Sequence, residues 1–558
     1  MRCVLLFLAL TMRALAAAEP LDLLLINGTI HTLDPGQPAA EAVGVRSGRI
    51  VFVGTNRAAE PFRPGARRLV DLAGATLVPG FNDAHVHLAG VGFRELSFDL
   101  EGTKGVAELQ AKLQARVAQT APKQWITGRG WIETHWSPPE FPTARDLDAV
   151  APAHPVALRR ADGHATVVNS LALQLARIDR STPNPRGGEI LRDPASHEPT
   201  GMLIDAAQTL VDRLIPPPTA AEVERALVVG AQREIALGWT AVQIAGQNYA
   251  ESELVRRLVA EQRIKLRIYS AVSAPGADAE RLLTDGAVIG ESDGRFTRRG
   301  VKLFIDGALG SRGAALLAPY ADSPQSSGLL MKNESELRPF LAAALRRGIQ
   351  VQTHAIGDRG NRLMLDLYER VFAEVPAANR PGPEPRWRLE HAQIIDRADL
   401  PRFAQLGVIA SMQPSHAIGD LFFAPKRLGP QRLEGAYAWQ SLLQSGTIIA
   451  AGSDAPVERG EPMIEFYAAV ARRSLDGFAN DDWRPAQRMT RLQALRALTL
   501  DAAYAAFEER ERGSLEPGKR ADFTVLSADI LRIPEPEILK TRCLMTIVGG
   551  EVVYAAPK

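Results

Sequence analysis

The sequence predicts an α/β protein built on a closed parallel barrel, with a small β domain formed by both ends of the chain and a subdomain inserted into the barrel. Apolar strands alternate with helices about eight times, which is typical of a parallel barrel. Short strands bounded by turn residues recur at the two termini. Roughly 150 residues separate His87 from Thr240, far more than a barrel connection needs.

Length and charge limit the functional classes. The chain has 558 residues, which predicts about two to four domains. Hydrophobic residues make up 46% and charged residues 23%, the profile of a soluble globular protein. The 65 Lys and Arg residues balance the 64 Asp and Glu residues, so we expect a small-molecule substrate and no nucleic-acid partner. No later segment is apolar for long enough to give a stable membrane anchor, and the sequence leaves a homo-oligomer open.

The N-terminus has the pattern of a secretory signal peptide. A basic start at Met1-Arg2 precedes an apolar run over Cys3–Leu10 and small residues up to Ala18. We therefore predict a signal peptide over residues 1–18 and a periplasmic or secreted protein. An apolar first strand or a misassigned start is the alternative. Cleavage would leave Cys543 as the one cysteine, which excludes an intrachain disulfide.

Short strands at both ends predict one shared β domain, residues 19–78 with residues 509–558. The turn residues between them favour antiparallel pairing, and neither end has enough strands to be stable alone. The predicted strands cover residues 22–26, 42–45, 50–53, 69–72, 75–78, 521–526, 544–548 and 551–554.

The barrel is predicted over residues 79–508, with the insertion, a subdomain or a lid, at about 95–235. Counting the strand that ends at His85, nine candidates compete for eight places, so either 156–160 or 266–272 is misplaced. The other candidates are 240–244, 301–305, 350–353, 386–389, 408–412 and 447–451. Capping boxes at Thr219/Glu222 and Asn333/Glu336 mark two helix starts.

Two histidines one residue apart give the first functional signal. His85 and His87 end an apolar strand that follows Pro79-Gly80, and side chains two apart on a strand share a face. They can therefore hold one metal ion together. Two histidines satisfied within the core are the structural alternative.

Polar residues recur at the ends of later strands. Lys302, His354, His391 and Asp454 each lie in or just after a predicted strand. In a parallel barrel these ends open on one rim, where active sites form. Imidazole and carboxylate ligands favour zinc among common ions, and Asp454 is placed to move a proton from an activated water.

Lys302 is a poor ligand as an ammonium. Addition of carbon dioxide to its amine would give a carbamate, an anion with two oxygens that can bridge two metals. The alternative is a lysine whose stem packs in the barrel while its head reaches the rim.

These motifs resemble the amidohydrolase superfamily, in the branch of long, often exported proteins similar to N-substituted formamide deformylase. The resemblance is carried by Pro-Gly-Phe-Asn-Asp-Ala-His-Val-His, Val-Lys-Leu-Phe-Ile-Asp-Gly, Thr-His-Ala-Ile-Gly-Asp, Leu-Glu-His-Ala-Gln and Gly-Ser-Asp-Ala-Pro. It covers nearly the whole mature chain. It implies a distorted (β/α)8 TIM barrel with a composite β-sandwich domain.

The resemblance also implies roles for the rim residues. His85 and His87 would be ligands from the first strand, His354 and His391 from the fifth and sixth, and Asp454 from the eighth. Asp454 would be both a ligand and the catalytic proton shuttle, and carbamylated Lys302 would bridge two metals. The superfamily includes one-metal members, so the sequence leaves one or two divalent metals per subunit open.

Four further residues are candidates for substrate binding. Asp162 and His164 lie in an Asp-Gly-His motif after the strand over 156–160, and His416 follows the seventh strand. Arg312 follows a glycine-rich segment and can bind a substrate carboxylate or carbonyl, or form a structural salt bridge.

The sequence thus predicts a metal-dependent amidohydrolase that cleaves an amide or formamide-like carbon–nitrogen bond other than a peptide bond. Ester, lactone or phosphotriester hydrolysis at the same site is the enzymatic alternative. A metal-containing binding protein without turnover and a barrel with a purely structural metal site are the remaining classes.

Overall fold

The computed structural model describes residues 20–557, apart from 162, 164, 186, 383 and 480–482. The chain divides into two compact units, Met1–Val91 with Leu227–Lys558, and Gly92–Ala226. The predicted signal peptide and the predicted substrate residues Asp162 and His164 lie outside the described residues. Within those residues, no helix has the length and apolar character needed to cross a membrane.

A nearly closed parallel barrel forms the centre of the first unit. Among the described residues, eight parallel strands follow one another in the sheet, in the order β22-β21-β20-β19-β18-β16-β15-β8. Their bounds are β8 (Phe81–Val86), β15 (Trp239–Gln247), β16 (Arg267–Ser273), β18 (Phe296–Phe304), β19 (Gln350–Ala355), β20 (Arg388–His391), β21 (Ile409–Met412) and β22 (Ile449–Ala451). The predicted (β/α)8 TIM barrel is therefore confirmed.

The last strand returns to the first through backbone contacts beyond the strand ends. The Asp454 N–H donates to the His85 carbonyl at 2.7 Å, and the His87 N–H donates to the Ala455 carbonyl at 2.9 Å. Gly452 permits this approach, because a Cβ there would lie 2.4 Å from the His85 nitrogen. Barrel closure therefore fixes the backbone of Asp454 beside His85 and His87.

Helices connect the barrel strands as predicted. Both predicted capping boxes are present, at the start of α7 (Ala220–Leu237) and of α11 (Glu334–Arg346). Other helices of this unit include α8 (Tyr249–Ala260), α9 (Ala277–Asp285), α12 (Asp358–Glu374), α13 (Leu400–Leu406), α14 (Pro414–Asp420), α16 (Trp439–Gln444), α17 (Pro462–Ala471), α18 (Arg491–Ala497) and α19 (Leu500–Ala505).

The second unit has a sheet of its own. Its strand order is β13-β14-β12-β11-β10-β9, and β11 (Val156–Arg160) lies within it. The remaining elements are β9 (Phe98–Asp99), β10 (Ile126–Trp131), β12 (Ala165–Val168), β13 (Gly188–Arg192), β14 (Pro199–Asp205), α3 (Val106–Val117), α4 (Ala144–Asp148), α5 (Ser170–Ala176) and α6 (Thr209–Asp212). The placement of 156–160 in the barrel is thus wrong, and 266–272 is the third barrel strand, β16.

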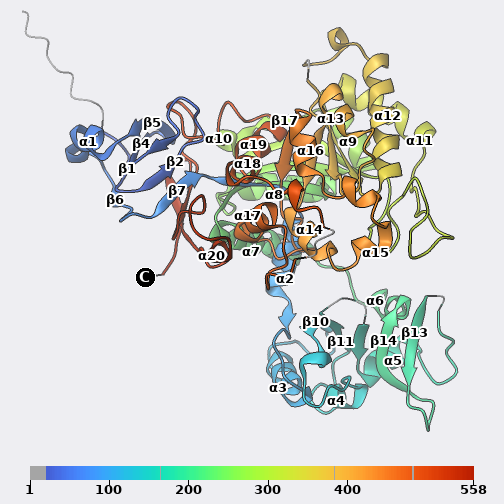
Figure 1. Cartoon of the computed structure of the whole chain (residues 1–558). Coiled ribbons are helices and arrows are strands. Elements are labelled where there is room, and N and C mark those ends of the chain that lie inside the picture. Colours follow the sequence, from blue (N-terminus) through green and yellow to red (C-terminus); the bar gives the residue numbers. More distant parts are fainter. Residues whose placement is uncertain are drawn as a thin grey trace, which may run out of the picture. The chain divides into compact units, whose positions relative to one another are not determined.

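The ends of the chain form two β-sheets, one of N-terminal strands alone and one of strands from both ends. One sheet has the order β5-β4-β1-β6, and the other has the order β25-β24-β23-β7-β2-β3. The bounds are β1 (Leu23–Ile26), β2 (Thr29–His31), β3 (Ala39–Ala40), β4 (Ala42–Arg46), β5 (Arg49–Gly54), β6 (Leu69–Asp71), β7 (Thr76–Pro79), β23 (Phe523–Leu526), β24 (Cys543–Val548) and β25 (Glu551–Ala555). Figure 1 shows the blue N-terminal strands beside the dark red C-terminal segments.

The two sheets share an apolar core. Leu25 and Val43 from one sheet are buried in the same cluster as Leu77, Phe523 and Ile547 from the other. The pairing is mixed, because β1 pairs with β6 and β2 pairs with β7 in parallel. The expectation of a purely antiparallel sheet is therefore wrong. The cause is the Asn27-Gly28 turn, which leads the chain from β1 into the other sheet.

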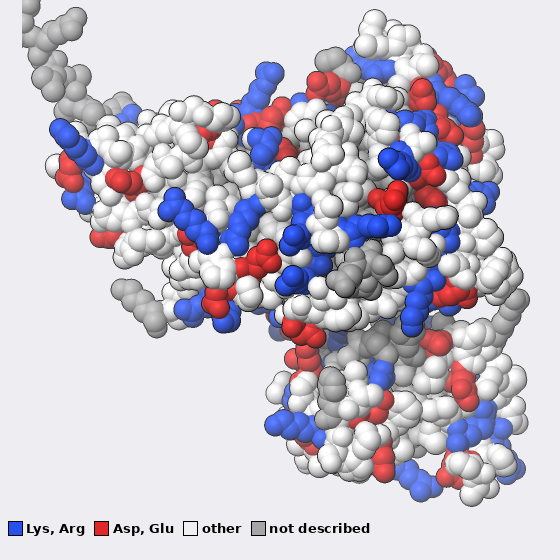
Figure 2. Space-filling view, viewed as in Figure 1, with Lys and Arg blue, Asp and Glu red and all other residues white. Residues whose placement is uncertain are grey.

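A buried ion pair joins the β domain to the barrel. Arg267 at the start of β16 donates to both Asp522 carboxylate oxygens, at 2.6 and 2.9 Å, and both side chains are almost fully buried. Elsewhere, Figure 2 shows described acidic and basic side chains mixed over the visible face, in keeping with the balanced charge.

Candidate metal centre

The carboxyl ends of five barrel strands deliver the predicted ligands to one place. His85 lies near the end of β8, Lys302 near the end of β18, His354 in β19 and His391 at the end of β20. Asp454 follows β22. Residues hundreds of positions apart therefore meet because parallel strands end on the same rim.

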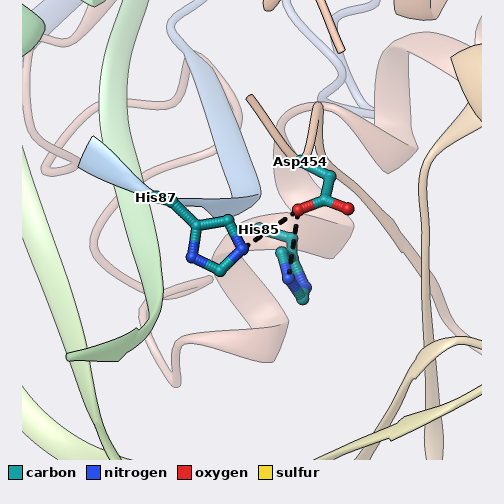
Figure 3. Close-up of side chains that lie close together, drawn as sticks. All are labelled: His85, His87 and Asp454. Carbon is teal, nitrogen blue, oxygen red and sulfur yellow. Dashed lines mark ion pairs between the residues drawn. The ribbon is translucent and has the colours of Figure 1, made fainter. Parts of the chain in front are cut away.

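Asp454 lies at the centre of the group. Its Oδ1 is 3.1 Å from Nε2 of His87 and 3.6 Å from Nε2 of His85, as the dashed lines in Figure 3 mark. Its Oδ2 is 3.5 Å from Nε2 of His416 and 4.0 Å from Nδ1 of His391. Two sets of potential ligands share it, His85-His87-Asp454 and His391-His416-Asp454, each with its ligand atoms within 4.8 Å of one another.

The other predicted ligands adjoin these sets. The Lys302 amine lies 3.1 Å from Nε2 of His85. The His391 ring lies 4.8 Å from that of His85 and 4.6 Å from that of His354, measured between centroids. The structure therefore brings together all six residues that the sequence predicts as ligands.

The chemistry of the group fits a divalent cation. Burial and the Lys302 charge lower the pKa of His85 to about 4 and of His354 to about 3, and burial lowers that of His391. These imidazoles are therefore neutral at pH 7, the form that binds metals. Nε2 of His354 and of His416 are buried and have no hydrogen-bond partner among the described residues. Histidine nitrogens without a hydrogen-bond partner are suited to bind a metal such as zinc.

Lys302 is buried among these groups. Burial lowers its pKa to about 8, although the carboxylates of Glu390 and Asp454 favour the charged form. A substantial fraction of this amine is therefore neutral, and nucleophilic, in mildly alkaline solution.

A charged pair that the sequence analysis missed orients His85. Nδ1 of His85 donates to Oε2 of Glu390, and Arg388 donates to both oxygens of Glu390, at 2.6 and 3.1 Å. Burial alone would raise the pKa of Glu390, but Arg388 and His85 hold it below its usual range. Because Nδ1 is used, Nε2 of His85 faces the site. The sequence signal for this pair was an arginine and a glutamate two positions apart, Arg388 and Glu390, on a strand that is fully buried.

Two glutamines that the sequence analysis also missed form hydrogen bonds with the rings of His391 and His416. Oε1 of Gln413 accepts from Nδ1 of His391 at 2.8 Å, and Nε2 of Gln393 lies 3.1 Å from Nδ1 of His416. Gln413 directly precedes α14 and Gln393 lies two residues after His391, so neither position stands out in the sequence.

A cavity of about 340 Å³ opens beside the cluster. His416 is among its lining residues, together with His87, Lys302, His354, His391 and Asp454. Arg312 is not, and it pairs instead with Asp322 at 3.2 and 2.9 Å. Of the described substrate candidates, the structure therefore places His416 at the cavity and Arg312 in an ion pair.

Known proteins share this fold and much of the sequence. A model of the amidohydrolase family matches residues 68–554. The chain is 36% identical to protein LONG AFTER FAR-RED 3 of Arabidopsis thaliana, over 96% of this chain and 91% of that protein. It is 30% identical to N-substituted formamide deformylase of Arthrobacter pascens, over 96% of this chain and 98% of that protein.

A solved structure agrees with these relatives. An uncharacterised metal-dependent hydrolase from Pyrococcus horikoshii superposes with a TM-score of 0.74 at 27% identity, over 92% of this chain and 99% of that one. The family match covers the whole barrel, the second unit and the C-terminal part of the β domain. The chain therefore belongs to the amidohydrolase family and is a hydrolase of carbon–nitrogen bonds.

Proposed function

We propose that this protein hydrolyses an amide or formamide-like bond of a small molecule, other than a peptide bond, with Asp454 as the proton shuttle. The observation that carries the proposal is the position of Asp454, within 3.6 Å of both His85 and His87 and on the wall of the cavity. The similarity to N-substituted formamide deformylase supports a formamide-like substrate.

We further propose zinc as the metal. His85, His87, His354, His391 and Asp454 would hold it, with one or two ions per subunit. A bound divalent metal supplies a Lewis acid that polarises the amide carbonyl and lowers the pKa of a coordinated water. In a two-ion site, Lys302 would serve as a further ligand in the form of a carbamate. Its depressed pKa and its position beside His85 support this assignment.

The residues of the chain account for the proton transfers. Asp454 takes a proton from water as the water oxygen bonds to the amide carbon. Asp454 then gives that proton to the nitrogen as the carbon–nitrogen bond breaks, so the products are a carboxylic acid and an amine. Burial would raise the pKa of Asp454, but His87 and the surrounding imidazoles hold it well below its usual range, so it starts as a base.

A substrate screen tests the proposal. The zinc-loaded protein is incubated with formamides, other amides, ureas and esters, and released amine, acid and alcohol are quantified. We expect formamides or related amides to be cleaved, and cleavage to be lost in His85→Ala. His31→Gln, which removes an imidazole on the β domain, serves as the control. Cleavage of esters alone would contradict the amide assignment, and full amidase activity in His85→Ala would contradict the site.

We also propose export. The pattern of residues 1–18 supports a cleaved signal and a periplasmic or secreted enzyme without a stable membrane anchor. The balanced charge supports the absence of a nucleic-acid partner. Mass spectrometry of the mature protein from a native producer tests this, with a start near residue 19 expected. A chain that begins at Met1 in that preparation would contradict it.

A further inference from the structure

A carboxylate outside the ligand group contacts the backbone of two segments that carry ligands. Asp83 lies in β8, two residues before His85, and its side chain is fully buried. Its Oδ1 accepts from the His85 N–H at 3.0 Å and from the Ser453 N–H at 2.9 Å. Its Oδ2 accepts from the Ser453 hydroxyl. Asp83 therefore ties the first barrel strand to the residue directly before Asp454.

The backbone of Asp454 has a strained conformation. Its φ is +57°, in the left-handed region that residues with a Cβ adopt only rarely. Such a conformation persists where the surrounding contacts hold it, and it is frequent at active sites. In this conformation the Asp454 carboxylate lies beside His85 and His87. The hydrogen bonds of the neighbouring residues therefore decide where that carboxylate points.

Both neighbours of Asp454 are linked to Asp83. Ser453 precedes Asp454 and donates to Asp83 through its N–H and its hydroxyl. Ala455 follows Asp454, and its N–H donates to the same Ser453 hydroxyl at 3.0 Å. The N–H of Asp454 donates to the His85 carbonyl at 2.7 Å. The strained residue is thus held from both sides by one hydrogen-bonded group.

The Asp83 carboxylate acts from behind the site. A Cβ on Gly452 would lie 2.6 Å from its Oδ1, so glycine at this position lets the carboxylate reach the Ser453 N–H. Asp83 is not among the described residues that line the cavity, whereas Asp454 is. Any effect of Asp83 on the reaction must therefore pass through the residues that it holds.

We propose that Asp83 is a positioning residue for Asp454. It keeps Asp454 in the left-handed conformation, so that the carboxylate faces His85 and His87 and can take a proton from water. When the hydrogen bonds to Asp83 are lost, Asp454 relaxes to an ordinary backbone conformation and its carboxylate moves away from the histidines. This inference rests on the proposed role of Asp454 as the proton shuttle.

Two variants and a matched control test the proposal. In Asp83→Asn, an amide nitrogen replaces one oxygen and cannot accept a hydrogen bond. Ser453→Ala removes only the hydroxyl, and it carries the test if Asp83→Asn does not fold. Ser252→Ala is the control, because Ser252 on α8 is equally buried and its hydroxyl bonds to that of Ser270, outside the cavity.

The first measurement is turnover of the best formamide by the zinc-loaded proteins. We expect kcat to fall by about 100-fold in Asp83→Asn and by about tenfold in Ser453→Ala, with KM within about twofold, as for a small misplacement of a catalytic group. Ser252→Ala should keep the wild-type kcat. Wild-type kcat in both Asp83→Asn and Ser453→Ala would overturn the proposal.

A double-mutant cycle tests whether Asp83 acts through Asp454. In Asp454→Asn the shuttle is already lost, so adding Asp83→Asn should lower kcat by less than about twofold. A role in folding alone predicts the same loss in both backgrounds. Equal losses in wild type and in Asp454→Asn would therefore also overturn the proposal.

Hydrogen exchange separates this inference from the proposed function, because it requires no turnover. Mass spectrometry of peptides that span residues 450–457 should show exchange about tenfold faster in Ser453→Ala and Asp83→Asn than in zinc-loaded wild type, with exchange in β19 unchanged. If this is observed in a protein that cleaves no formamide, the proposed function fails and the positioning of Asp454 stands. If formamides are cleaved and exchange is unchanged in both variants, the inference fails and the function stands.

Discussion

Glu390 on the sixth barrel strand accepts a hydrogen bond from Nδ1 of His85 on the first strand, across the interior of the barrel. The two residues are 305 positions apart, and both side chains are fully buried. This contact fixes the tautomer of His85, so that Nε2 and its lone pair face Asp454 and Lys302.

Shortening Glu390 should therefore weaken metal binding. In Glu390→Asp the negative charge beside Arg388 remains, but the carboxylate withdraws from His85. We expect zinc affinity to fall by about 10- to 100-fold, the usual effect of losing a group that orients a ligand. Chelator competition measures it, and Glu280→Gln, which changes an exposed carboxylate on α9, is the control. An unchanged affinity would show that the contact does not orient the ligand.

Replacement of Asp454 should separate proton transfer from folding. Asp454→Asn keeps the shape of the side chain but can no longer accept the proton of water. We expect kcat to fall by about 10²- to 10⁴-fold, with little change in the unfolding temperature. The measurement is turnover of the best substrate from the screen, together with metal content. Wild-type kcat in a metal-loaded variant would exclude Asp454 as the shuttle.

The proposed carbamylation of Lys302 can be tested directly by NMR spectroscopy. Because burial lowers the pKa of Lys302 to about 8, its neutral amine reacts with carbon dioxide at a lower pH than an ordinary lysine does. Protein loaded with zinc in ¹³C-bicarbonate should give a carbamate carbon signal in NMR spectra. Lys302→Arg should lack this signal and bind fewer ions, whereas Lys265→Arg on the surface should retain both. A wild-type protein without the signal would leave Lys302 as a free amine.

The Arg267–Asp522 pair should contribute to stability at neutral pH and lose that contribution in acid. Burial would raise the pKa of Asp522, but the Arg267 charge and hydrogen bonds lower it below 3.8. A carboxyl with a lowered folded-state pKa stabilises the protein above its unfolded-state pKa, and the effect disappears as the pH falls through the folded-state pKa.

Asp522→Asn leaves the Arg267 charge buried without its partner. We expect a loss of about 3–5 kcal/mol near pH 7, measured as a shift of the urea midpoint, and a smaller difference from wild type below pH 3.8. Glu537→Gln, which breaks the exposed pair with Lys540, should cost less than about 1 kcal/mol. Equal effects of the two substitutions would contradict the role of the buried pair.

The fold and the ligand residues could be predicted because both depend on local patterns. The regular alternation of strands and helices predicts the barrel. A polar residue at the end of an apolar strand, such as His85 or His391, can be recognised from that strand's own sequence. The hairpins at Ser47-Gly48 and Gly549-Gly550 are likewise visible, because each pair adopts the positive φ values that such turns need.

Contacts between distant segments were not predictable in the same way. The sequence shows Glu390, but nothing in it shows that Nδ1 of His85 faces that carboxylate. Strand 156–160 has the composition of a barrel strand, and its place in the other unit depends on its partners β10 and β12.

The pairing of β7 with β23 has a consequence for synthesis of the protein. Residues near position 78 hydrogen-bond to residues near position 524, so the second sheet is incomplete until the chain is almost finished. The edge of β7 therefore lacks its native partner for more than 400 residues of further translation. A stop codon anywhere before β23 would leave that edge permanently available to other chains, and such truncated products are expected to aggregate.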